Sequence, residues 1–366
     1  MSASKRVPSV LVAMSGGVDS SVAAAILHRE GYRVLGSHMK LVHLDGVEHG
    51  CCGPRAEADA RAVAEIAGFD FEVVDMSGEF ERTVLADFFE EHRSGRTPNP
   101  CVRCNEHIKF GAFLDRADRL GFDFVATGHY ARTWRDWSDR WHLGRGADRT
   151  KDQSYVLHML GQEQLGRALF PVGEGAKAET RAMAERLGLP VAGKPDSQEV
   201  CFVPGADHGA FLREHAPDLV RWGGEVVGTD GSILGRHDGT FRFTVGQRRG
   251  LGVSTGARTY VVDVDAPSNR IVVGPEQLLA RRGLVAERVS WVAGRPPAAG
   301  PFEAEVRVRY RGDDIPAVVE ASADGTGARV EFRRPERAIA PGQSVVFYRG
   351  DEVLGGGTIL RAIRSG

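Results

Sequence analysis

The chain has 366 residues, of which 42% are hydrophobic and 26% charged, and its formal net charge at pH 7 is −2. This length allows two or three domains, and the composition is that of an ordinary globular protein rather than a disordered or fibrous one. No apolar run approaches the roughly 20 residues that span a bilayer, and no signal-peptide cleavage site precedes the first strand, so we expect a cytoplasmic protein with no membrane contact. The near-neutral charge excludes a global basic field, so any RNA contact must come from local patches.

The N-terminal part alternates strand and helix patterns. Strands are predicted over residues 10–14, 33–39, 69–75 and 122–126, and helices over residues 22–29, 57–67, 80–92 and 108–119. Strands separated by helices of this length predict βαβ units and a parallel sheet. Helical patterns continue at residues 154–160 and 178–187.

From about residue 223 the chain changes to short apolar alternations broken by Gly, Pro, Asn and Asp. "TYVVDVDAPSNRIVVG" predicts a hairpin over residues 259–274, and strands are expected within residues 302–312 and 328–350. We therefore expect an α/β domain over residues 1–210, a small β-rich central domain over 211–275 and a β-barrel or sandwich over 276–366.

The stretch "VLVAMSGGVDSSVAAAIL" predicts a strand, a glycine loop and a helix. Gly16 and Gly17 let backbone N–H groups turn toward an anion, and the helix beginning near Ser20 adds the positive end of its dipole. The hydroxyls of Ser15 and Ser21 add donors. A loop of this kind lies at the carboxyl edge of a parallel sheet, so the stretch predicts a phosphate site there.

The loop lacks the lysine that P-loops place on the β and γ phosphates. Asp19 stands where a cation is expected, which is tolerable if Mg²⁺ neutralises it or if it holds the loop itself. We therefore predict attack at the α phosphate of a nucleotide rather than γ-phosphoryl transfer.

The five cysteines are Cys51, Cys52, Cys101, Cys104 and Cys201. An odd number without a secretory context favours thiol chemistry or metal over a disulfide framework. Asn105, His107 and Lys109 follow Cys104 and would lower a thiol pKa. Cys201 begins an apolar run. Cys51 and Cys52 are interpreted as small buried hydrophobes, and the C-x-x-C of Cys101 and Cys104 lacks the second half of a zinc site.

The "SGGVDS" loop resembles that of the ATP-pyrophosphatase family, whose members adenylate a carbonyl oxygen and release pyrophosphate. The loop alone leaves several synthetases open. Four further motifs make the chain similar, over nearly its whole length, to the bacterial tRNA-specific 2-thiouridylase family: "TGHYAR" at 127–132, "KDQSYVL" at 151–157, "KPDSQEVCFV" at 194–203 and "FTVGQRRGLGV" at 243–253.

This resemblance implies an adenine nucleotide α-hydrolase-like domain followed by a central β domain and a C-terminal barrel. It implies that ATP, with Mg²⁺, adenylates O2 of wobble uridine 34, that Cys201 carries the sulfur as a persulfide, and that Cys104 is the nucleophile that releases it. A redox disulfide between Cys104 and Cys201 follows from that mechanism. The ATP contacts that it implies are Ala13, Met14, Ser15, Gly16, Gly17, Val18, Asp19, Ser20, Met39 and Gly128.

The same resemblance implies tRNAs for Lys, Glu and Gln as partners, together with a cysteine desulfurase or a sulfur-relay protein. The tRNA contacts that it implies are Lys151, Asp152, Gln153, Arg309 and Tyr310. The alternation in "EVRVRYRG" predicts a strand with Arg307, Arg309 and Arg311 on one face, which would grip a backbone. Only six of the 47 basic residues are lysines, so arginine is common throughout, and a merely solvated strand face would give the same pattern.

One departure from the family concerns Cys101, where many relatives carry Asp. A thiol there leaves open an iron–sulfur cluster on Cys101, Cys104 and Cys201 as a less favoured mechanism. The residues also leave open an AMP-forming synthetase that acts on a small molecule, and a tRNA-binding or cluster-binding protein without catalysis.

Overall fold

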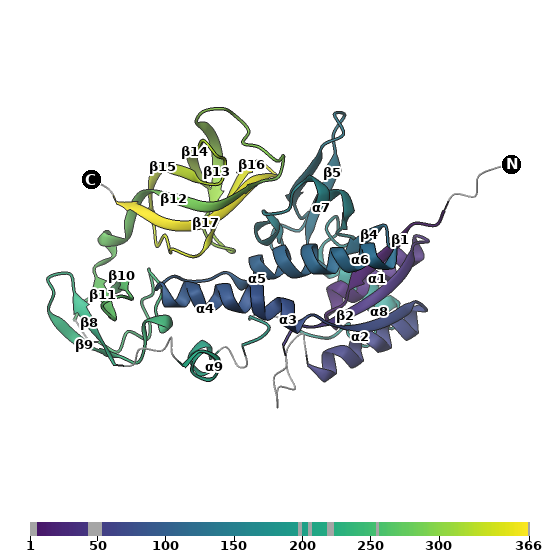
Figure 1. Ribbon diagram of the computed structural model, residues 1–366, viewed down its shortest axis with the longest axis horizontal. Helices are drawn as coiled ribbons and strands as arrows, with labels where there is room; N and C mark the ends of the chain where they lie inside the picture. Colours follow the sequence, from purple (N-terminus) through teal and green to yellow (C-terminus); the bar gives the residue numbers. More distant parts are fainter. Residues whose placement is uncertain are drawn as a thin grey trace. The chain divides into compact units, whose positions relative to one another are not determined.

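A computed structural model describes residues 6–42, 53–196, 200–203, 207–217, 223–253 and 256–364 (Figure 1). By its contacts the chain divides into two compact units. The first comprises Met1–Val84, Cys101–Ala206 and Asp351–Val353, and the second comprises Leu85–Pro100, Asp207–Gly350 and Leu354–Gly366. In the described ranges no helix has both the length and the apolar character needed to cross a membrane.

A parallel sheet of five strands, in the order β3-β2-β1-β4-β7, forms the centre of the first unit. Its strands are β1 (Ser9–Ala13), β2 (Arg33–Lys40), β3 (Asp70–Asp75), β4 (Phe124–Ala126) and β7 (Ala168–Leu169). Every residue of β1 is buried, as expected for a central strand covered on both faces. Because β1 lies between β2 and β4, the loops that follow β1 and β4 meet at the carboxyl edge, where α/β sheets bind ligands.

Helices α1 (Val18–Arg29), α2 (Pro54–Ala67) and α8 (Lys177–Arg186) pack together beside this sheet. Val22 and Ala23 of α1 are buried against Val10 and Val12 of β1, and this contact fixes where the preceding loop lies. The other helical segments up to residue 167 are α3 (Ser77–Phe80), η1 (Glu81–Leu85), α4 (Ala86–Arg93), α5 (Pro100–Arg103), η2 (Cys104–Ala112), α6 (Phe113–Leu120), η3 (Ser154–Leu157) and α7 (Gln162–Arg167).

The first unit also holds a hairpin that the sequence pattern did not predict. Strands β5 (Ala131–Arg135) and β6 (Trp141–Arg145) pair antiparallel, and β6 pairs with the first residues of β17 (Glu352–Arg364). The turn between them is held by Asp136, whose carboxylate accepts hydrogen bonds from the backbone N–H groups of Ser138 and Arg140. Alternating aromatic and charged residues hide these strands from a search for apolar runs.

The second unit contains a mixed sheet in the order β10-β11-β8-β9. Its elements are β8 (Gly224–Gly228), β9 (Ile233–His237), β10 (Tyr260–Asp265) and β11 (Arg270–Gly274), with α9 (His208–His215), η6 (Thr240–Arg242) and η7 (Glu276–Leu279) nearby in the chain. The antiparallel pairing of β10 and β11 confirms the predicted hairpin. Val226, Val261 and Ile271 form its small core.

Six antiparallel strands close into the C-terminal barrel, in the order β12-β15-β14-β13-β16-β17 with β12 pairing β17. They are β12 (Ala280–Trp291), β13 (Phe302–Arg307), β14 (Ile315–Ala321), β15 (Ala328–Arg337), β16 (Ser344–Arg349) and β17. Val306, Val330, Phe347 and Ile359 are fully buried inside it. The predicted parallel sheet, β-rich centre and C-terminal barrel are thus confirmed.

The predicted arginine face beyond residue 307 is wrong. Strand β13 ends at Arg307, and the backbone N–H of Gly312 bonds the carbonyl of Arg309, so the chain turns there. Arg307 bonds Asp314, whereas Arg309 is exposed and lies outside the strand. The alternation of Arg with Val in the sequence continues beyond Arg307, although the backbone is no longer part of a strand there.

Candidate active site

The glycine loop joins β1 to α1 at the carboxyl edge of the sheet. Gly16 has a φ of +69°, and a Cβ there would lie 2.2 Å from the carbonyl oxygen of Ala56, so only glycine fits. Gly17 is the N-cap of the 12-residue helix α1. The hydroxyls of Ser15 and Ser20 lie 3.2 Å apart across the loop. The turn and the helix dipole together suit a bound phosphate.

The residues expected to contact ATP on this segment differ in exposure. Ser15 is exposed and Gly17 and Asp19 are half-buried, whereas the remaining five are buried: Ala13, Met14, Gly16, Val18 and Ser20. The accessible positions on this segment are therefore Ser15, Gly17 and Asp19.

Asp19 is held by groups from distant parts of the chain. The ammonium of Lys177 lies 2.6 and 2.8 Å from its two carboxylate oxygens. The hydroxyl of Tyr130 donates to it at 2.9 Å and also contacts the hydroxyl of Thr180 at 2.9 Å. Burial raises the pKa of Tyr130, which keeps this hydroxyl protonated and able to donate. Asp19 therefore positions the loop, one of the two roles expected for it.

A second lysine reaches the loop from the segment that leads to Cys201. The ammonium of Lys194 donates to the carbonyl oxygen of Gly16 at 2.8 Å and to Asp59 at 2.7 Å. Lys177 and Lys194 bring to the loop the positive charge that its own sequence lacks. No local spacing signals either lysine, because each arrives only through the fold.

Asp196 links these cations to a predicted tRNA contact. Its carboxylate accepts from Lys151 at 2.8 Å and from Arg181 at 2.6 Å, and it lies 2.9 Å from Lys177. Burial opposes ionisation of this carboxyl, but the hydrogen bonds from Lys151 and Lys177 outweigh it and lower its pKa to about 2. Asp196 therefore stays charged and holds three cations beside the glycine loop.

Gly128 and Met39 lie where the sheet argument places them. A Cβ on Gly128 would lie 2.5 Å from the backbone nitrogen of Ser20, so the loop after β4 lies directly against the start of α1. Met39 is buried near the end of β2. Its neighbour His38 has Nδ1 2.9 Å from the carbonyl oxygen of Met14, which ties the end of β2 to the glycine loop.

The three cysteines within the described ranges are thiols rather than disulfides. Cys104 is buried at the first position of the π-helical segment η2, a type of segment that is frequent at functional sites. Cys201 is half-buried, and the adjacent Phe202 packs edge-on against Phe80 with ring centroids 5.3 Å apart. The disulfide between Cys104 and Cys201 is not formed in this structure.

Cys101 is exposed at the surface, yet the crowding of protein around its thiol raises its pKa, the neighbouring Cys201 thiol raises it further, and the ammonium of Lys109 opposes both. In the described ranges no group of three or more His, Cys, Asp or Glu residues is arranged to hold a metal ion. Cys51 and Cys52 lie outside the described residues.

The charge of Lys109 acts on the thiol of Cys101 and on the imidazole of His129. His129 was not predicted as a site residue. Lys109 donates to the side chain of Asn105 at 2.9 Å, and Asn105 donates to the carbonyl of Val156 at 2.7 Å. His129 has Nδ1 2.6 Å from the hydroxyl of Thr127. Burial holds the pKa of His129 well below its usual value, and the charge of Lys109 lowers it further, so the imidazole is neutral. Its place in "TGHYAR", one residue after Gly128, was the available signal.

The predicted tRNA contacts have different surroundings. Lys151 has a partly exposed side chain on Asp196, whereas Asp152 is buried and accepts hydrogen bonds from the backbone of Gly146 and Ser154. Gln153 accepts from the backbone nitrogen of Tyr130. Arg309 and Tyr310, in the second unit, are exposed.

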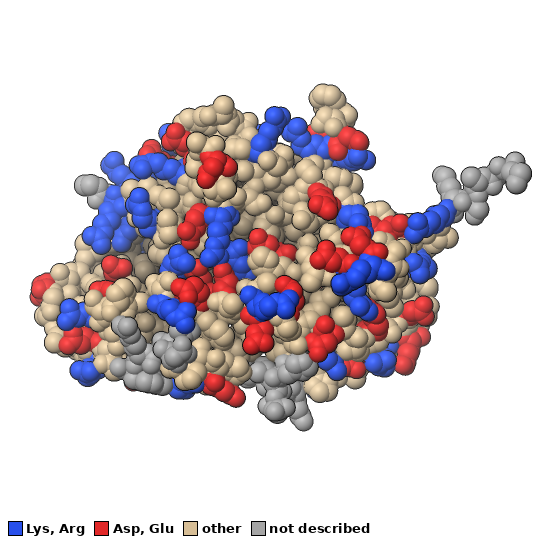
Figure 2. Space-filling model, viewed as in Figure 1, with Lys and Arg blue, Asp and Glu red and all other residues tan. Residues whose placement is uncertain are grey.

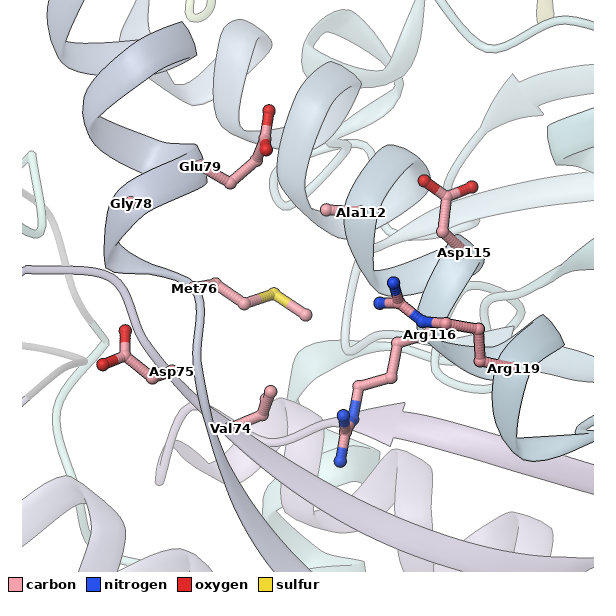
Figure 3. Close-up of a pocket in the computed structure, with 9 residues that line it drawn as sticks. All are labelled: Val74, Asp75, Met76, Gly78, Glu79, Ala112, Asp115, Arg116 and Arg119. Atoms are coloured by element: carbon pink, nitrogen blue, oxygen red, sulfur yellow. The ribbon is translucent and has the colours of Figure 1, made fainter.

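A separate pocket of about 370 Å³ lies at the end of β3 beside α6 (Figure 3). The side chain of Met76 points into it, and Arg116 at its edge bonds both carboxylate oxygens of Glu72 at 2.9 and 2.6 Å. Its lining is Val74, Asp75, Met76, Gly78, Glu79, Ala112, Asp115, Arg116 and Arg119. None of the predicted site residues lines this pocket, so it is distinct from the glycine loop.

Family models match three consecutive parts of the chain. They are the tRNA methyl transferase HUP domain at residues 8–205, the tRNA methyl transferase PRC-barrel domain at 209–275 and the aminomethyltransferase beta-barrel domain at 281–359. The parallel sheet with its glycine loop is therefore a HUP domain, to which two β-rich domains are joined.

Relatives that match nearly the whole chain identify the family within this class. A tRNA-specific 2-thiouridylase MnmA of Geobacter metallireducens is 49% identical over 366 residues, covering 98% of each chain. Another, from Symbiobacterium thermophilum, is 47% identical over 97% of this chain and 92% of the relative. The chain belongs to the tRNA-specific 2-thiouridylase family. A solved NMN synthetase from Francisella tularensis has a TM-score of 0.30 at 12% identity, covering 52% of this chain and 66% of that one.

Proposed function

We propose that this protein is a tRNA-uridine 2-sulfurtransferase, which adenylates O2 of wobble uridine 34 with ATP and replaces that oxygen with sulfur. The products are 2-thiouridine, AMP and pyrophosphate. One observation carries the proposal: the segment that leads to Cys201 also supplies Lys194 to the glycine loop, with its ammonium 2.8 Å from the carbonyl of Gly16. A residue close in sequence to Cys201 thus contacts the glycine loop, which supports placing nucleotide activation and sulfur transfer in one domain.

Activation is needed because a uracil oxygen is a poor leaving group. Attack of O2 on the α phosphate of ATP releases pyrophosphate and turns the oxygen into part of AMP, which leaves readily. The backbone N–H groups at Gly16 and Gly17, with the ammonium groups of Lys177 and Lys194, would bind the departing pyrophosphate. Mg²⁺ would neutralise phosphate charge when bound with ATP, while Asp19, whose two carboxylate oxygens are held by Lys177, keeps the loop in place.

Sulfur replaces the activated oxygen in two steps. The terminal sulfur of a Cys201 persulfide attacks C2 of the base, and AMP departs with the original oxygen. The Cys104 thiolate then attacks the Sγ of Cys201, which breaks the bond to the transferred sulfur, frees 2-thiouridine and forms a Cys104–Cys201 disulfide. A thiol reductant restores the two thiols by exchange, and a cysteine desulfurase or sulfur-relay protein reloads Cys201.

The substrate base must leave its stack to reach the loop, so most affinity has to come from other contacts. We assign those contacts to Lys151, Asp152, Gln153, Arg309 and Tyr310, and the acceptors to the tRNAs for Lys, Glu and Gln. Lys151 suits this role because its ammonium is partly exposed yet held on Asp196 at 2.8 Å. A phosphate there would lie on the same charged network as the glycine loop.

The test is nucleoside mass spectrometry on unmodified tRNA for Glu incubated with the full-length protein, Mg-ATP and a persulfide donor. We expect 2-thiouridine with the wild type and none with Cys201→Ser. AMP formation without tRNA would instead assign a small-molecule synthetase. Product that appears only after iron–sulfur reconstitution would assign the cluster-dependent mechanism.

A further inference from the structure

Asn105 is a buried polar side chain next to Cys104, and the proposed reaction leaves it without a role. It is 1% exposed in η2, although asparagine has a low helix propensity. Both ends of its amide are bonded, since Nδ2 donates to the carbonyl oxygen of Val156 at 2.7 Å and Oδ1 accepts from the ammonium of Lys109 at 2.9 Å. Such an amide resists displacement, because breaking either bond leaves a buried group unpaired.

The two hydrogen bonds of Asn105 connect it to different parts of the chain. Lys109 lies four residues further along η2, so its bond to Asn105 stays within that segment. Val156 belongs to η3, so the other bond ties the start of η2 to a separate element. A π-helical run of nine residues is longer than the single turns in which π-helices usually occur, so contacts with neighbouring elements have to hold it.

The segment η3 is in turn joined to the glycine loop. Gln153, which precedes η3, exchanges two hydrogen bonds with Tyr130: its backbone nitrogen donates to the carbonyl oxygen of Tyr130 at 2.8 Å, and its Oε1 accepts from the backbone nitrogen of Tyr130 at 2.9 Å. The hydroxyl of Tyr130 donates to Asp19 at 2.9 Å. A continuous path of contacts therefore runs from Asn105 through η3 to the glycine loop, and it lies within the first unit.

Surface charges are less suited to fix this helix. Around α6, which continues η2, Figure 2 shows Lys and Arg side chains interspersed with Asp and Glu side chains. Ion pairs between exposed side chains contribute little to stability. The buried amide of Asn105 is therefore the better candidate to set where η2 begins.

We propose that Asn105 is a positioning residue, whose bond to Val156 fixes the Cys104 thiol relative to the glycine loop where the base is activated. The inference rests on the proposed function for the role of Cys104. A displacement of about 1 Å is enough to slow a reaction strongly, because the reacting atoms must meet in near-attack geometry. Asn105 thus acts on the reaction through the thiol and not on ATP.

Two variants of the full-length protein separate the two bonds. Asn105→Leu keeps the volume of the side chain and removes both bonds, whereas Asn105→Asp keeps the oxygen that accepts from Lys109 and loses the donor to Val156. Asn269→Asp is the matched control, because the hydrogen bonds that the structure describes for Asn269 involve only its backbone. Asn105→Asp decides the test if Asn105→Leu does not fold.

The measurements are kcat for 2-thiouridine formation on unmodified tRNA for Glu, KM for ATP, thermal melting, and the rates at which iodoacetamide alkylates Cys104 and Cys201. We expect kcat to fall roughly tenfold to a hundredfold in both Asn105 variants, with KM for ATP within about twofold of the wild type. Alkylation of Cys104 should become roughly tenfold faster relative to Cys201, because the start of η2 opens more often. The control should match the wild type throughout.

Two results would overturn the inference. A wild-type kcat in Asn105→Asp would show that the bond to Val156 does not position the thiol. Equal acceleration of alkylation at Cys104 and Cys201, together with a lower melting midpoint, would assign Asn105 a general structural role. Since alkylation needs no turnover, these results are distinct from an absence of 2-thiouridine with the wild type, which would remove the proposed function itself.

Discussion

The glycine loop and the cysteine segment of the same HUP domain differ in how firmly the surrounding residues hold them. The loop is fixed on every side, with Gly16 against Ala56, Gly128 against Ser20 and Asp19 held by Lys177. The cysteines remain thiols in three different environments: Cys104 is buried, Cys201 half-buried and Cys101 exposed. Under the proposed function, this difference predicts a preorganised nucleotide site and a sulfur centre that completes its contacts only during the reaction.

The largest expected effect is a loss of thiolation that leaves ATP binding intact, which would separate the roles of these two regions. Cys201→Ser should lower thiolation roughly a thousandfold or more, because the nucleophile that carries sulfur is gone. ATP affinity, measured by calorimetry, should stay close to wild type, since the loop is untouched. Full loss of ATP binding in this variant would show that the cysteine segment builds the loop and would break the comparison.

Replacing Lys177, which is distant from the loop in sequence, tests directly whether its ammonium holds the glycine loop. Lys177→Met leaves Asp19 and Asp196 without a shared ammonium, and we expect ATP binding to weaken by about 1.5–3 kcal/mol, the range for hydrogen bonds to charged groups. A double-mutant cycle with Asp19→Asn isolates the pair. If Lys177→Met costs as much in the Asp19→Asn background as in the wild type, the Asp19–Lys177 pair does not position the loop.

A smaller effect is expected from crowding the loop. Gly128→Ala places a Cβ 2.5 Å from the backbone nitrogen of Ser20, and backbone cannot yield cheaply, so we expect a loss of about 1–3 kcal/mol in stability together with weaker ATP binding. Gly300→Ala is the control, because a Cβ there meets nothing within 4 Å. Equal unfolding midpoints for the two variants would contradict the close approach.

The smallest effect concerns acid. The pKa of Asp196 falls from 3.8 to about 2 on folding, so between these values the unfolded chain binds more protons. Its contribution to stability is present above about pH 4 and is lost as the pH falls toward 2. Asp196→Asn should flatten the dependence of the unfolding free energy on pH in this window. A slope as steep as that of the wild type would show that other carboxyls set the acid sensitivity.

Local patterns were enough to predict the sheet, the glycine loop and the β10–β11 hairpin, because each depends on residues close in the chain. Long-range contacts were beyond them: Lys177, Lys194 and Tyr130 reach the loop only after folding.

The strand prediction failed where the backbone no longer follows the sequence pattern. The Arg-Val alternation continues after Arg307, but the turn at Gly312 ends β13. The β5–β6 hairpin escaped prediction because its residues are largely polar or aromatic. The roles of Cys104 and Cys201 came from family likeness, since two thiols so far apart in sequence give no spacing signal.

The most direct measurement follows the oxygen that sulfur replaces. Unmodified tRNA carrying a heavy oxygen isotope at O2 of uridine 34 is converted with Mg-ATP and a persulfide donor, and the released AMP is analysed by mass spectrometry. Adenylation of O2 predicts that the heavy oxygen appears in the phosphate of AMP in step with 2-thiouridine. Heavy oxygen released to water, with unlabelled AMP, would contradict activation of the base by ATP.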